Sequence, residues 1–326
     1  MEKFSNWRDK ATGISPFMPF PFPHSASKGN NSSSSSNTYK FITSSKFNAI
    51  LYKFILFCTK LPIFLTKVPF FIIVSTLYTL TGFKLFLTFT FTFLFGFNPI
   101  EIAVDGVKSS QRDKLQSYRP KRGELVIANY SSPLDGYIIA SVCQSSSNIV
   151  ILVPDKQGDL YQYTPWSLID HCFNQIQGKG PVEDVSKLKD KLVVLLLEGT
   201  TSNNSALLPF IKLNDKYTWD DFDRVKSLVI KLYPNYFTLP IPYISSLYYL
   251  YQLLTDFTRK NARVKIYDFD NTGNNNNNNN NKGTKQLDIS KIRRTFELNS
   301  LNLINQDLSI DAKARFIDYY FNHSVK

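Results

Sequence analysis

Two apolar runs near the N-terminus place the strongest constraint on how this chain folds. Residues 68–83 and 85–97 are largely apolar and aromatic, and only Lys84 separates them. Neither run has a polar face to turn to water, which argues against a core helix of a soluble domain. Each is also shorter than the roughly 20 residues that a helix needs to cross a membrane. The pattern predicts a helical hairpin embedded in a membrane from one side and hinged near Gly82 and Lys84. A single tilted span with Lys84 reaching the surface is the alternative.

The residues before these runs carry positive charge at a regular spacing. Four lysines recur every seven residues: Lys46, Lys53, Lys60 and Lys67. A helix places residues at this spacing on one side, so residues 46–66 are predicted to form an amphipathic helix at the membrane surface, interrupted near Pro62. The apolar segment starts too late for a cleaved signal peptide. The Lys and Arg residues before it place the N-terminus on the cytosolic side.

The charge of the whole chain indicates an anionic partner. The formal net charge is +12, but the lysines are scattered and no zinc-finger or RNA-binding pattern occurs, which argues against a nucleic acid. Basic residues around an apolar segment favour membrane lipid as the partner. The three cysteines are widely spaced, without the spacing of a disulfide framework or a metal site. We therefore predict no metal ligands and a reducing compartment.

Composition and pattern divide the chain into five parts. We expect an N-terminal segment with a disordered Ser/Asn spacer (1–45), the amphipathic helix and membrane hairpin (46–98), an α/β domain (99–270), a disordered Asn-rich insert (271–285) and C-terminal helices (286–326). In the α/β domain, short apolar runs alternate with helical stretches, including a helix over 161–175 and an apolar run at 237–243. Residues 149–153 and 193–197 are apolar throughout, as in central strands covered on both faces. The domain is therefore predicted to have a mostly parallel central sheet flanked by helices.

Polar corners follow two of the apolar runs. In the first, N-Y-S-S-P-L-D at 129–135, helix capping by Ser132 and Asp135 explains much of the pattern. In the second, E-G-T-T at 198–201, Glu198 ends a buried strand, where a carboxylate is costly unless it is paired or used. In parallel sheets, functional groups gather in the loops beyond the carboxyl ends of the strands. Both corners are predicted to lie there.

Together, the two corners resemble motifs of the glycerolipid acyltransferases of the lysophosphatidic acid acyltransferase type, N-H-x-x-x-x-D and E-G-T. Asn129 and Asp135 fall on the first motif, and Glu198, Gly199 and Thr200 on the second. The resemblance covers about residues 123–243, and residues 1–20 are similar to the start of a fungal member. It implies that acyl-CoA, as a co-substrate without a further cofactor, acylates lysophosphatidic acid or a related lysophospholipid. The one-sided hairpin is compatible with both the endoplasmic reticulum membrane and the lipid droplet, where we expect the protein with its catalytic domain in the cytosol.

The first motif departs from the family at its central residue. The family's histidine takes the proton of the acceptor hydroxyl and its aspartate orients the imidazole. The resemblance therefore assigns catalysis to Asn129, Tyr130 and Asp135, although a phenol is a poor base at neutral pH. Three substitutes for the histidine are open: an activated Tyr130 phenolate, His171, or the phosphate of the acceptor itself.

The second motif departs from the family at Thr201, where arginine is common. The resemblance implies that Glu198 orders the backbone of Gly199 while Thr200 and Thr201 bind the phosphate of the acceptor. Three lysines are candidates to restore a cation: Lys156, Lys179 and Lys212.

Two functions from different classes follow. The first is a lysophosphatidic acid acyltransferase that forms phosphatidic acid for glycerolipid synthesis. The second is a catalytically silent homologue that binds lipid or acyl-CoA as a membrane scaffold, which the replacement of histidine by Tyr130 favours. The first depends on the two corners meeting beside a cleft.

Overall fold

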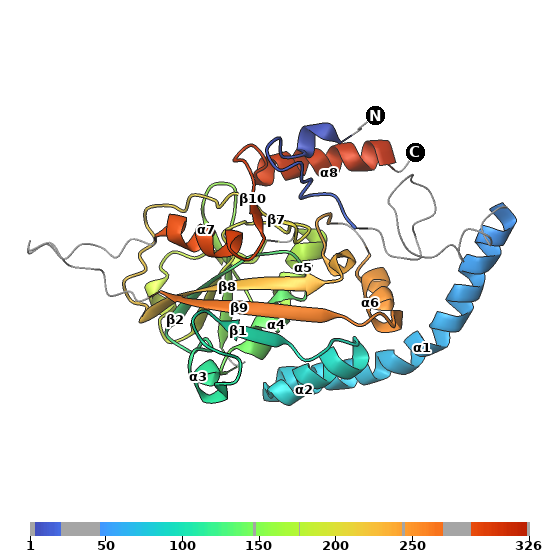
Figure 1. Ribbon diagram of the computed structural model, residues 1–326, viewed down its shortest axis with the longest axis horizontal. Helices are drawn as coiled ribbons and strands as arrows, with labels where there is room; N and C mark the ends of the chain where they lie inside the picture. Colours follow the sequence, from blue (N-terminus) through green and yellow to red (C-terminus); the bar gives the residue numbers. More distant parts are fainter. Residues whose placement is uncertain are drawn as a thin grey trace, which may run out of the picture.

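The computed structural model describes residues 4–20, 46–145, 148–175, 177–242, 245–269 and 288–324. Within these residues, eight strands form one sheet and helices cover both of its faces, which confirms the α/β prediction (Figure 1). The spacer and the insert predicted around 25–37 and 271–285 lie outside the described residues. In spatial order, the sheet contains β1 (Glu101–Val104), β9 (Asn261–Phe269), β8 (Arg224–Tyr233), β2 (Glu124–Ala128), β6 (Leu192–Leu195), β3 (Ile149–Pro154), β4 (Leu160–Tyr163) and β5 (Lys179–Pro181).

The sheet is mixed, so the prediction of a mostly parallel sheet is wrong. The central strands β8, β2, β6 and β3 are mutually parallel, but β9 is antiparallel to β8, and β4 is antiparallel to both β3 and β5. Two neighbouring parallel strands need a crossover connection, which returns the chain from the carboxyl end of one strand to the amino end of the next. Residues 155–159 instead form a tight turn between β3 and β4, and Tyr233 at the end of β8 pairs with Asn261 at the start of β9. Each connection therefore begins and ends at the carboxyl end of the central strands.

Two local predictions also fail. The helix expected over 161–175 is the strand β4 followed by α5 (Ser167–Asn174), and the described residues 238–242 of the apolar run at 237–243 form a loop after a short 3-10 helix, Asn235–Phe237, rather than a strand. Pro240 and Pro242 lack the backbone N–H that a central strand would donate. Leu239 instead donates its N–H to the carbonyl of Ser131, 2.9 Å away. This loop therefore lies against the first polar corner.

The central strands separate two hydrophobic cores. In β2, Val126 and Ala128 pack into the core that includes α4 (Asp135–Val142) and α6 (Ser246–Thr255), whereas Leu125 and Ile127 pack into the core that includes α7 (Ile289–Glu297). Burial on both faces explains why these strands are apolar at every position. The helices around the sheet are α3 (Arg112–Ser117), α4 (Asp135–Val142), α5, α6 (Ser246–Thr255), α7 (Ile289–Glu297) and α8 (Ile310–Ser324).

The apolar N-terminal runs form a helical hairpin. The long helix α1 (Lys46–Thr81) ends before Gly82, whose φ of 68° reverses the chain into α2 (Lys84–Phe89) and a π-helical turn (Thr90–Leu94). The second arm runs back along the first, since the Phe71 and Phe95 rings lie 5.7 Å apart. The reversal lies where the sequence predicts it. The prediction of an interruption near Pro62 is wrong. The helix α1 continues through Pro62 and Pro69 and is bent rather than broken (Figure 1).

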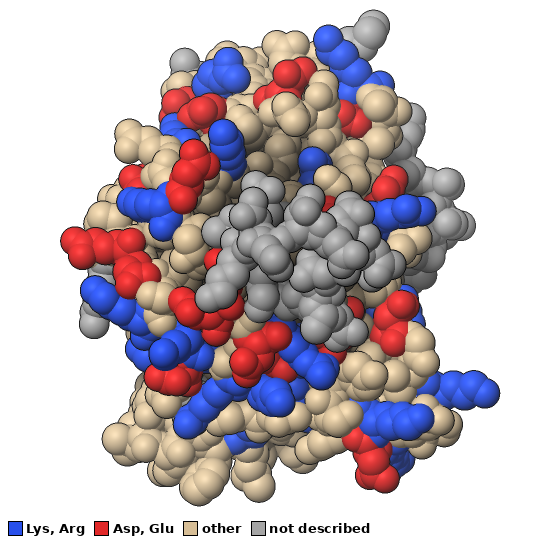
Figure 2. All heavy atoms as spheres, turned by 90° about the vertical axis from the view of Figure 1, so that its left-hand side faces the viewer, with Lys and Arg blue, Asp and Glu red and all other residues tan. Residues whose placement is uncertain are grey.

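The hairpin exposes most of its apolar surface. Within the described residues, Cys58–Thr81 is the one helical segment long and apolar enough to cross a membrane, and Lys84–Leu94 is a shorter apolar segment. Figure 2 shows that the lowest part of one face, at the level of α2 in Figure 1, carries few charges, whereas Lys, Arg, Asp and Glu are mixed over the rest. Large apolar side chains exposed on the hairpin are Phe70, Ile72, Ile73, Leu80, Phe83, Leu85 and Phe93.

The two ends of the chain pack together. A short strand pair, β7 (Ala206–Leu207) with β10 (Asn302–Leu303), joins the C-terminal region to the body. Beside it, α8 packs against residues 4–20 in a third hydrophobic cluster centred on Phe17 and Phe316. Figure 1 shows this N-terminal segment lying along α8.

Candidate active site

The two polar corners meet at the carboxyl edge of the parallel strands. Tyr130 follows β2 and Glu198 follows β6, and the N–H of Tyr130 donates to the Oε1 atom of Glu198 at 2.7 Å. The N–H of Ser202 donates to the carbonyl of Tyr130 at 2.9 Å. The other oxygen of Glu198 accepts from the N–H of Leu208 at 2.8 Å. Glu198 therefore joins the two corners through one oxygen and holds the chain after β7 through the other.

Glu198 is fully enclosed by protein. Burial raises its pKa to about 8, although the two backbone N–H donors act in the opposite direction. Gly199, the next residue, has a φ of 65°, and a Cβ atom there would lie 2.4 Å from Ile211 Cδ1 and 2.8 Å from the Pro154 carbonyl. Only glycine fits this position, so the tight turn after Glu198 depends on it.

Asp135 caps its own corner. Its Oδ2 atom accepts from the N–H groups of Ser131 and Ser132 at 2.7 and 2.8 Å. Its Oδ1 atom is buried and has no hydrogen-bond partner in the described part of the chain. Burial raises the pKa of Asp135 to about 7. The carboxylate fixes the loop by bonding the two serines, and it does not orient an imidazole of the described residues.

Asn129 ties two strands together. Its side-chain amide donates to the carbonyl of Ile230 at 2.9 Å, and its Oδ1 atom accepts the N–H of the same residue at 2.7 Å. These bonds continue the pairing of β2 with β8 beyond the last strand residue. The geometry gives Asn129 a positioning role.

Tyr130 is buried beside two residues of α5, the half-buried His171 and the buried Cys172. Its hydroxyl is 2.9 Å from His171 Nδ1 and 2.9 Å from Cys172 Sγ. Burial raises the pKa of Tyr130 far above its usual range, and nearby Cys172 adds to this, so the phenol keeps its proton. Burial and, to a smaller extent, the positive charge of Lys313 lower the pKa of His171 to about 4. At neutral pH His171 is therefore an uncharged imidazole.

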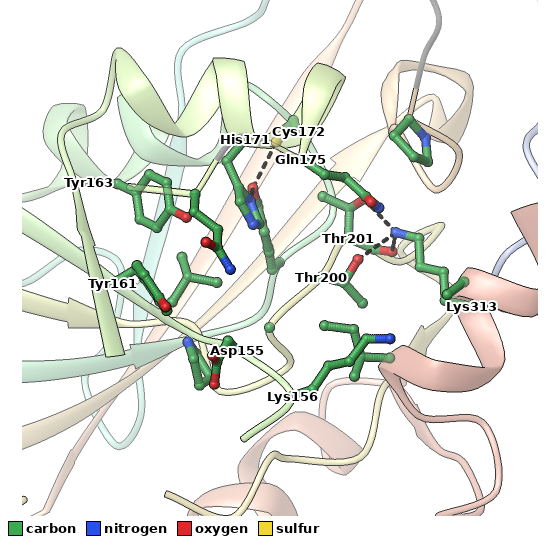
Figure 3. A pocket seen from close by; sticks show the side chains of 18 of the residues that line it. Asp155, Lys156, Tyr161, Tyr163, His171, Cys172, Gln175, Thr200, Thr201 and Lys313 are labelled. Atoms are coloured by element: carbon green, nitrogen blue, oxygen red, sulfur yellow. Dashed lines mark hydrogen bonds between the residues drawn. The ribbon is translucent and has the colours of Figure 1, made fainter. Parts of the chain in front are cut away.

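A lysine from the C-terminal helix reaches the second corner. The Nζ atom of Lys313 donates to Thr200 Oγ1 at 2.8 Å, to Thr201 Oγ1 at 2.9 Å and to the Thr201 carbonyl at 2.6 Å. Figure 3 shows Lys313 pointing from α8 toward both threonines. Burial lowers its pKa to about 7, while Cys172 and Glu198 act in the opposite direction.

These groups surround a cavity of about 480 Å³. His171 and Cys172 form one side, and Thr200, Thr201 and Lys313 form another (Figure 3). Tyr130 also lines the cavity. The remaining lining residues are Val153, Pro154, Asp155, Lys156, Gln157, Tyr161, Tyr163, Gln175, Gln177, Gly199, Pro242, Ile310 and Ala314.

The three lysines proposed from the sequence as phosphate-binding cations differ in their positions relative to the cavity. Lys156 lines the cavity and pairs with Asp311 at 2.8 Å, with both side chains more than half exposed. Lys212 is exposed and does not line the cavity. The side chain of Lys179 is outside what the structure describes.

A second, apolar cavity of about 250 Å³ lies between the hairpin and the body. The first polar corner separates the two cavities, since Tyr130 lines the first while Pro133 and Leu134 line the second. Most of the other lining side chains are apolar or aromatic: Phe71, Tyr78, Leu87, Phe91, Phe95, Tyr137, Trp166, Ile169, Phe173, Leu247, Tyr249, Leu250 and Leu253.

Sequence reasoning missed Lys313. It lies three residues before Phe316, so both project from one side of α8, and Phe316 is completely buried. A lysine on the apolar side of a predicted helix is a usable signal, because a charged side chain is rarely buried without a partner. His171, by contrast, is among the three substitutes for the family's histidine that the sequence suggests.

The comparisons with known proteins bear on this site. No family model matches the chain, and no solved structure matches it. Over 214 residues, the chain is 28% identical to lysophosphatidic acid:oleoyl-CoA acyltransferase 1 of Saccharomyces cerevisiae, covering 64% of this chain and 61% of the yeast protein. Over 271 residues, it is 27% identical to a protein of Schizosaccharomyces pombe with the provisional name lysophosphatidic acid:oleoyl-CoA acyltransferase, covering 76% and 78%. The first match thus spans less than two thirds of its relative. The chain is a relative of fungal proteins named for lysophosphatidic acid:oleoyl-CoA acyltransferase activity, as its two motifs indicated.

Proposed function

We propose that this protein is a membrane-bound acyltransferase that transfers the acyl group of acyl-CoA to lysophosphatidic acid or a related lysophospholipid. One observation carries the proposal: an uncharged imidazole, His171, and a buried cation, Lys313, line the same cavity. The acceptor needs a base for its hydroxyl and a counter-charge for its phosphate. The names of the two fungal relatives support the same substrates.

His171 is the group best placed to act as the base. In the tautomer with hydrogen on Nδ1, it donates to the Tyr130 hydroxyl, which donates to Cys172 Sγ. The Nε2 atom then keeps its lone pair. The acceptor oxygen attacks the thioester carbonyl, its proton passes to Nε2, the C–S bond breaks, and the CoA thiolate leaves and takes that proton from Nε2, which restores the neutral imidazole. Tyr130 holds the imidazole, as aspartate does in other acyl transfer sites.

The low pKa of His171 makes it a weak base in the empty site. An anionic phosphate beside Lys313 would offset the positive charge that helps to lower the pKa of His171. Substrate binding therefore raises the basicity of the imidazole at the moment when it is needed. Asn129, Asp135 and Glu198 hold the corners in place through their backbone hydrogen bonds.

The apolar cavity and the hairpin fit a lipid substrate. The cavity beside Pro133 offers a site for part of an acyl chain next to the reacting groups. The exposed apolar side chains of α1 and α2 would lie in the lipid, with the sheet domain beside the headgroups. We place the protein at the endoplasmic reticulum membrane and the lipid droplet with this domain in the cytosol, acting in glycerolipid synthesis.

The test is direct assay of the purified full-length chain in liposomes with labelled oleoyl-CoA and lysophosphatidic acid. We expect labelled phosphatidic acid, and we expect His171→Gln to lose most of this turnover while remaining folded. A chain that forms no product with any lysophospholipid, yet binds oleoyl-CoA, would instead be a silent lipid-binding homologue. The carboxylate of Asp135 bonds two serines rather than an imidazole, and this contact favours that second function.

A further inference from the structure

Lys313 carries a buried charge without a carboxylate partner. The side chain is 2% exposed, and its three ammonium protons have three acceptors, all of them neutral oxygens of Thr200 and Thr201. No carboxylate lies within ion-pair distance of Lys313 in the described part of the chain. A buried cation is costly unless an anion compensates it. The arrangement therefore favours an anionic ligand in the adjoining cavity.

The carboxylates near the cavity are already engaged. Glu198 accepts two backbone N–H groups, from Tyr130 of the first corner and from Leu208 after β7. Asp155, which lines the cavity, accepts the N–H groups of Gln157 and Asp159 in its own turn. In the described residues, the Thr200 hydroxyl accepts from Lys313 and donates to no protein acceptor. A phosphate would find a cation and a free hydroxyl donor together.

The N-terminal segment holds α8 in the position that delivers Lys313. Phe316, one turn beyond Lys313, contacts the rings of Trp7 and Phe17 at centroid distances of 5.5 and 5.7 Å. Trp7 also lies 4.7 Å from the ring of Tyr319. Residues from opposite ends of the chain therefore form one aromatic cluster.

The same segment is bonded to the loop of the second corner. The side-chain amide of Asn203 donates to the carbonyls of Ser15 and Met18 at 2.9 and 3.0 Å, and its N–H donates to the carbonyl of Pro16 at 3.0 Å. Asp9 accepts the N–H of Asn305, which precedes α8, at 3.3 Å. Residues 4–20 thus bridge the corner and the helix.

We infer that residues 4–20 and α8 form a cap over the second corner, and that this cap supplies Lys313 as the cation that binds the phosphate of the acceptor lysophospholipid. The inference rests on the proposed function. It assigns a role to the opening stretch of the sequence and to a helix that neither motif covers. It also means that Lys156, whose charge is exposed and paired with Asp311, is not the cation that binds the phosphate.

The cap predicts a preference among acceptors. A phosphate monoester presents its full negative charge to Lys313 and to the Thr200 hydroxyl. A monoacylglycerol of the same chain length presents no charge. Removing the cation should therefore weaken the binding of the first acceptor and leave the second unchanged, and Arg at this position should preserve part of the difference.

The experiment measures binding without turnover. Labelled lysophosphatidic acid and monoacylglycerol of equal chain length are titrated against the full chain in detergent micelles, without acyl-CoA. We expect Lys313→Met to raise the Kd of lysophosphatidic acid about 10- to 100-fold, as for the loss of a hydrogen bond between charged groups. Lys313→Arg should retain tighter binding than Lys313→Met, and the exposed Lys108→Met serves as the matched control. Thermal unfolding of each variant shows whether it is folded.

The cap itself is tested without changing Lys313. Trp7→Ala removes the ring that packs on Phe316 and Tyr319, and we expect a smaller rise in the same Kd. Equal binding by wild type and a folded Lys313→Met, or a larger effect from Lys156→Met, would overturn the inference. Unchanged binding by Trp7→Ala would overturn the role of the cap. A wild type that binds lysophosphatidic acid but makes no product contradicts the proposed function instead.

Discussion

The carboxylate of Glu198 accepts the backbone N–H of Tyr130 across 2.7 Å, joining two loops that are 68 residues apart in the sequence. The same carboxylate accepts the N–H of Leu208 with its other oxygen. One buried side chain therefore sets the distance between the loop that carries Tyr130 and the loop that carries Thr200. These two hydrogen bonds explain why a carboxylate lies at the end of a buried strand. They do not require Glu198 to take a direct part in the reaction.

Glu198→Gln should destabilise the protein and reduce its activity together. A glutamine has one acceptor oxygen, so its NH₂ group would face one of the two N–H donors. We expect a loss of about 1–3 kcal/mol in the free energy of unfolding, measured by denaturant titration. Glu297→Gln, at an exposed position of α7, is the control. A stable Glu198→Gln with lost activity would show that the carboxylate acts on substrate.

Asp135→Asn should retain most of the activity that Asp135→Ala loses. The asparagine oxygen can accept the N–H groups of Ser131 and Ser132, and its NH₂ group would occupy the place of the unpartnered Oδ1 atom. Alanine leaves both N–H groups unsatisfied in a buried loop. The measurements are kcat and Tm for both variants. If asparagine abolished turnover in a protein of normal Tm, the carboxylate would have a catalytic role.

Tyr130→Phe should lower kcat with little effect on the KM for the acceptor. The substitution keeps the buried ring but removes the hydroxyl that contacts His171 and Cys172. The imidazole then loses its orienting hydrogen bond, and we expect kcat to fall about tenfold or more. Steady-state kinetics at saturating oleoyl-CoA would measure this. Normal kcat in the variant would exclude the Tyr130–His171 pair from the mechanism.

The pH dependence of kcat/KM should show the loss of the positive charge of Lys313. Burial lowers its pKa to about 7 in the free protein, so it is charged below that pH and neutral above it. If the cation binds phosphate, kcat/KM for lysophosphatidic acid should fall as the pH rises through about 7. Arginine remains charged at every accessible pH, so Lys313→Arg should lack this decline. The ionisation of the acceptor is common to both proteins and cancels in their ratio, so parallel profiles would refute the prediction.

Acidic substitutions on the hairpin should release the protein from lipid. Leu80, Phe83 and Leu85 surround the turn between α1 and α2, with side chains 78%, 65% and 71% exposed. A carboxylate at the bilayer centre is costly, by about 2.5–3.5 kcal/mol on insertion scales. The triple Asp variant should float less with liposomes in a density gradient, while changing exposed Leu298 to Asp should not affect flotation. Unaltered flotation of the triple variant would place the hairpin turn outside the membrane.

The sequence by itself determined the local features of this protein. Apolar runs of strand length identified β3 and β6, and Gly82 located the reversal of the hairpin, because a residue with positive φ is needed there. The order and spacing of the two corners indicated the relationship to the fungal acyltransferases. The helix cap expected at Ser132 is not formed, since α4 begins at Asp135 without a side-chain cap, but the bond from the Ser132 N–H to the Asp135 carboxylate lies within the same short stretch of chain.

The tertiary structure decided which distant groups meet. Strand direction depends on where each connection returns to the sheet, and composition does not record that, so the sheet proved mixed. The contact of Tyr130 with His171 depends on how α5 packs, and the contact of Lys313 with Thr200 joins residues 113 positions apart. Such contacts arise from the free energy of packing the whole chain, including the cost of burying a charged side chain such as Lys313. Local patterns show the parts of this site, and long-range packing brings them together.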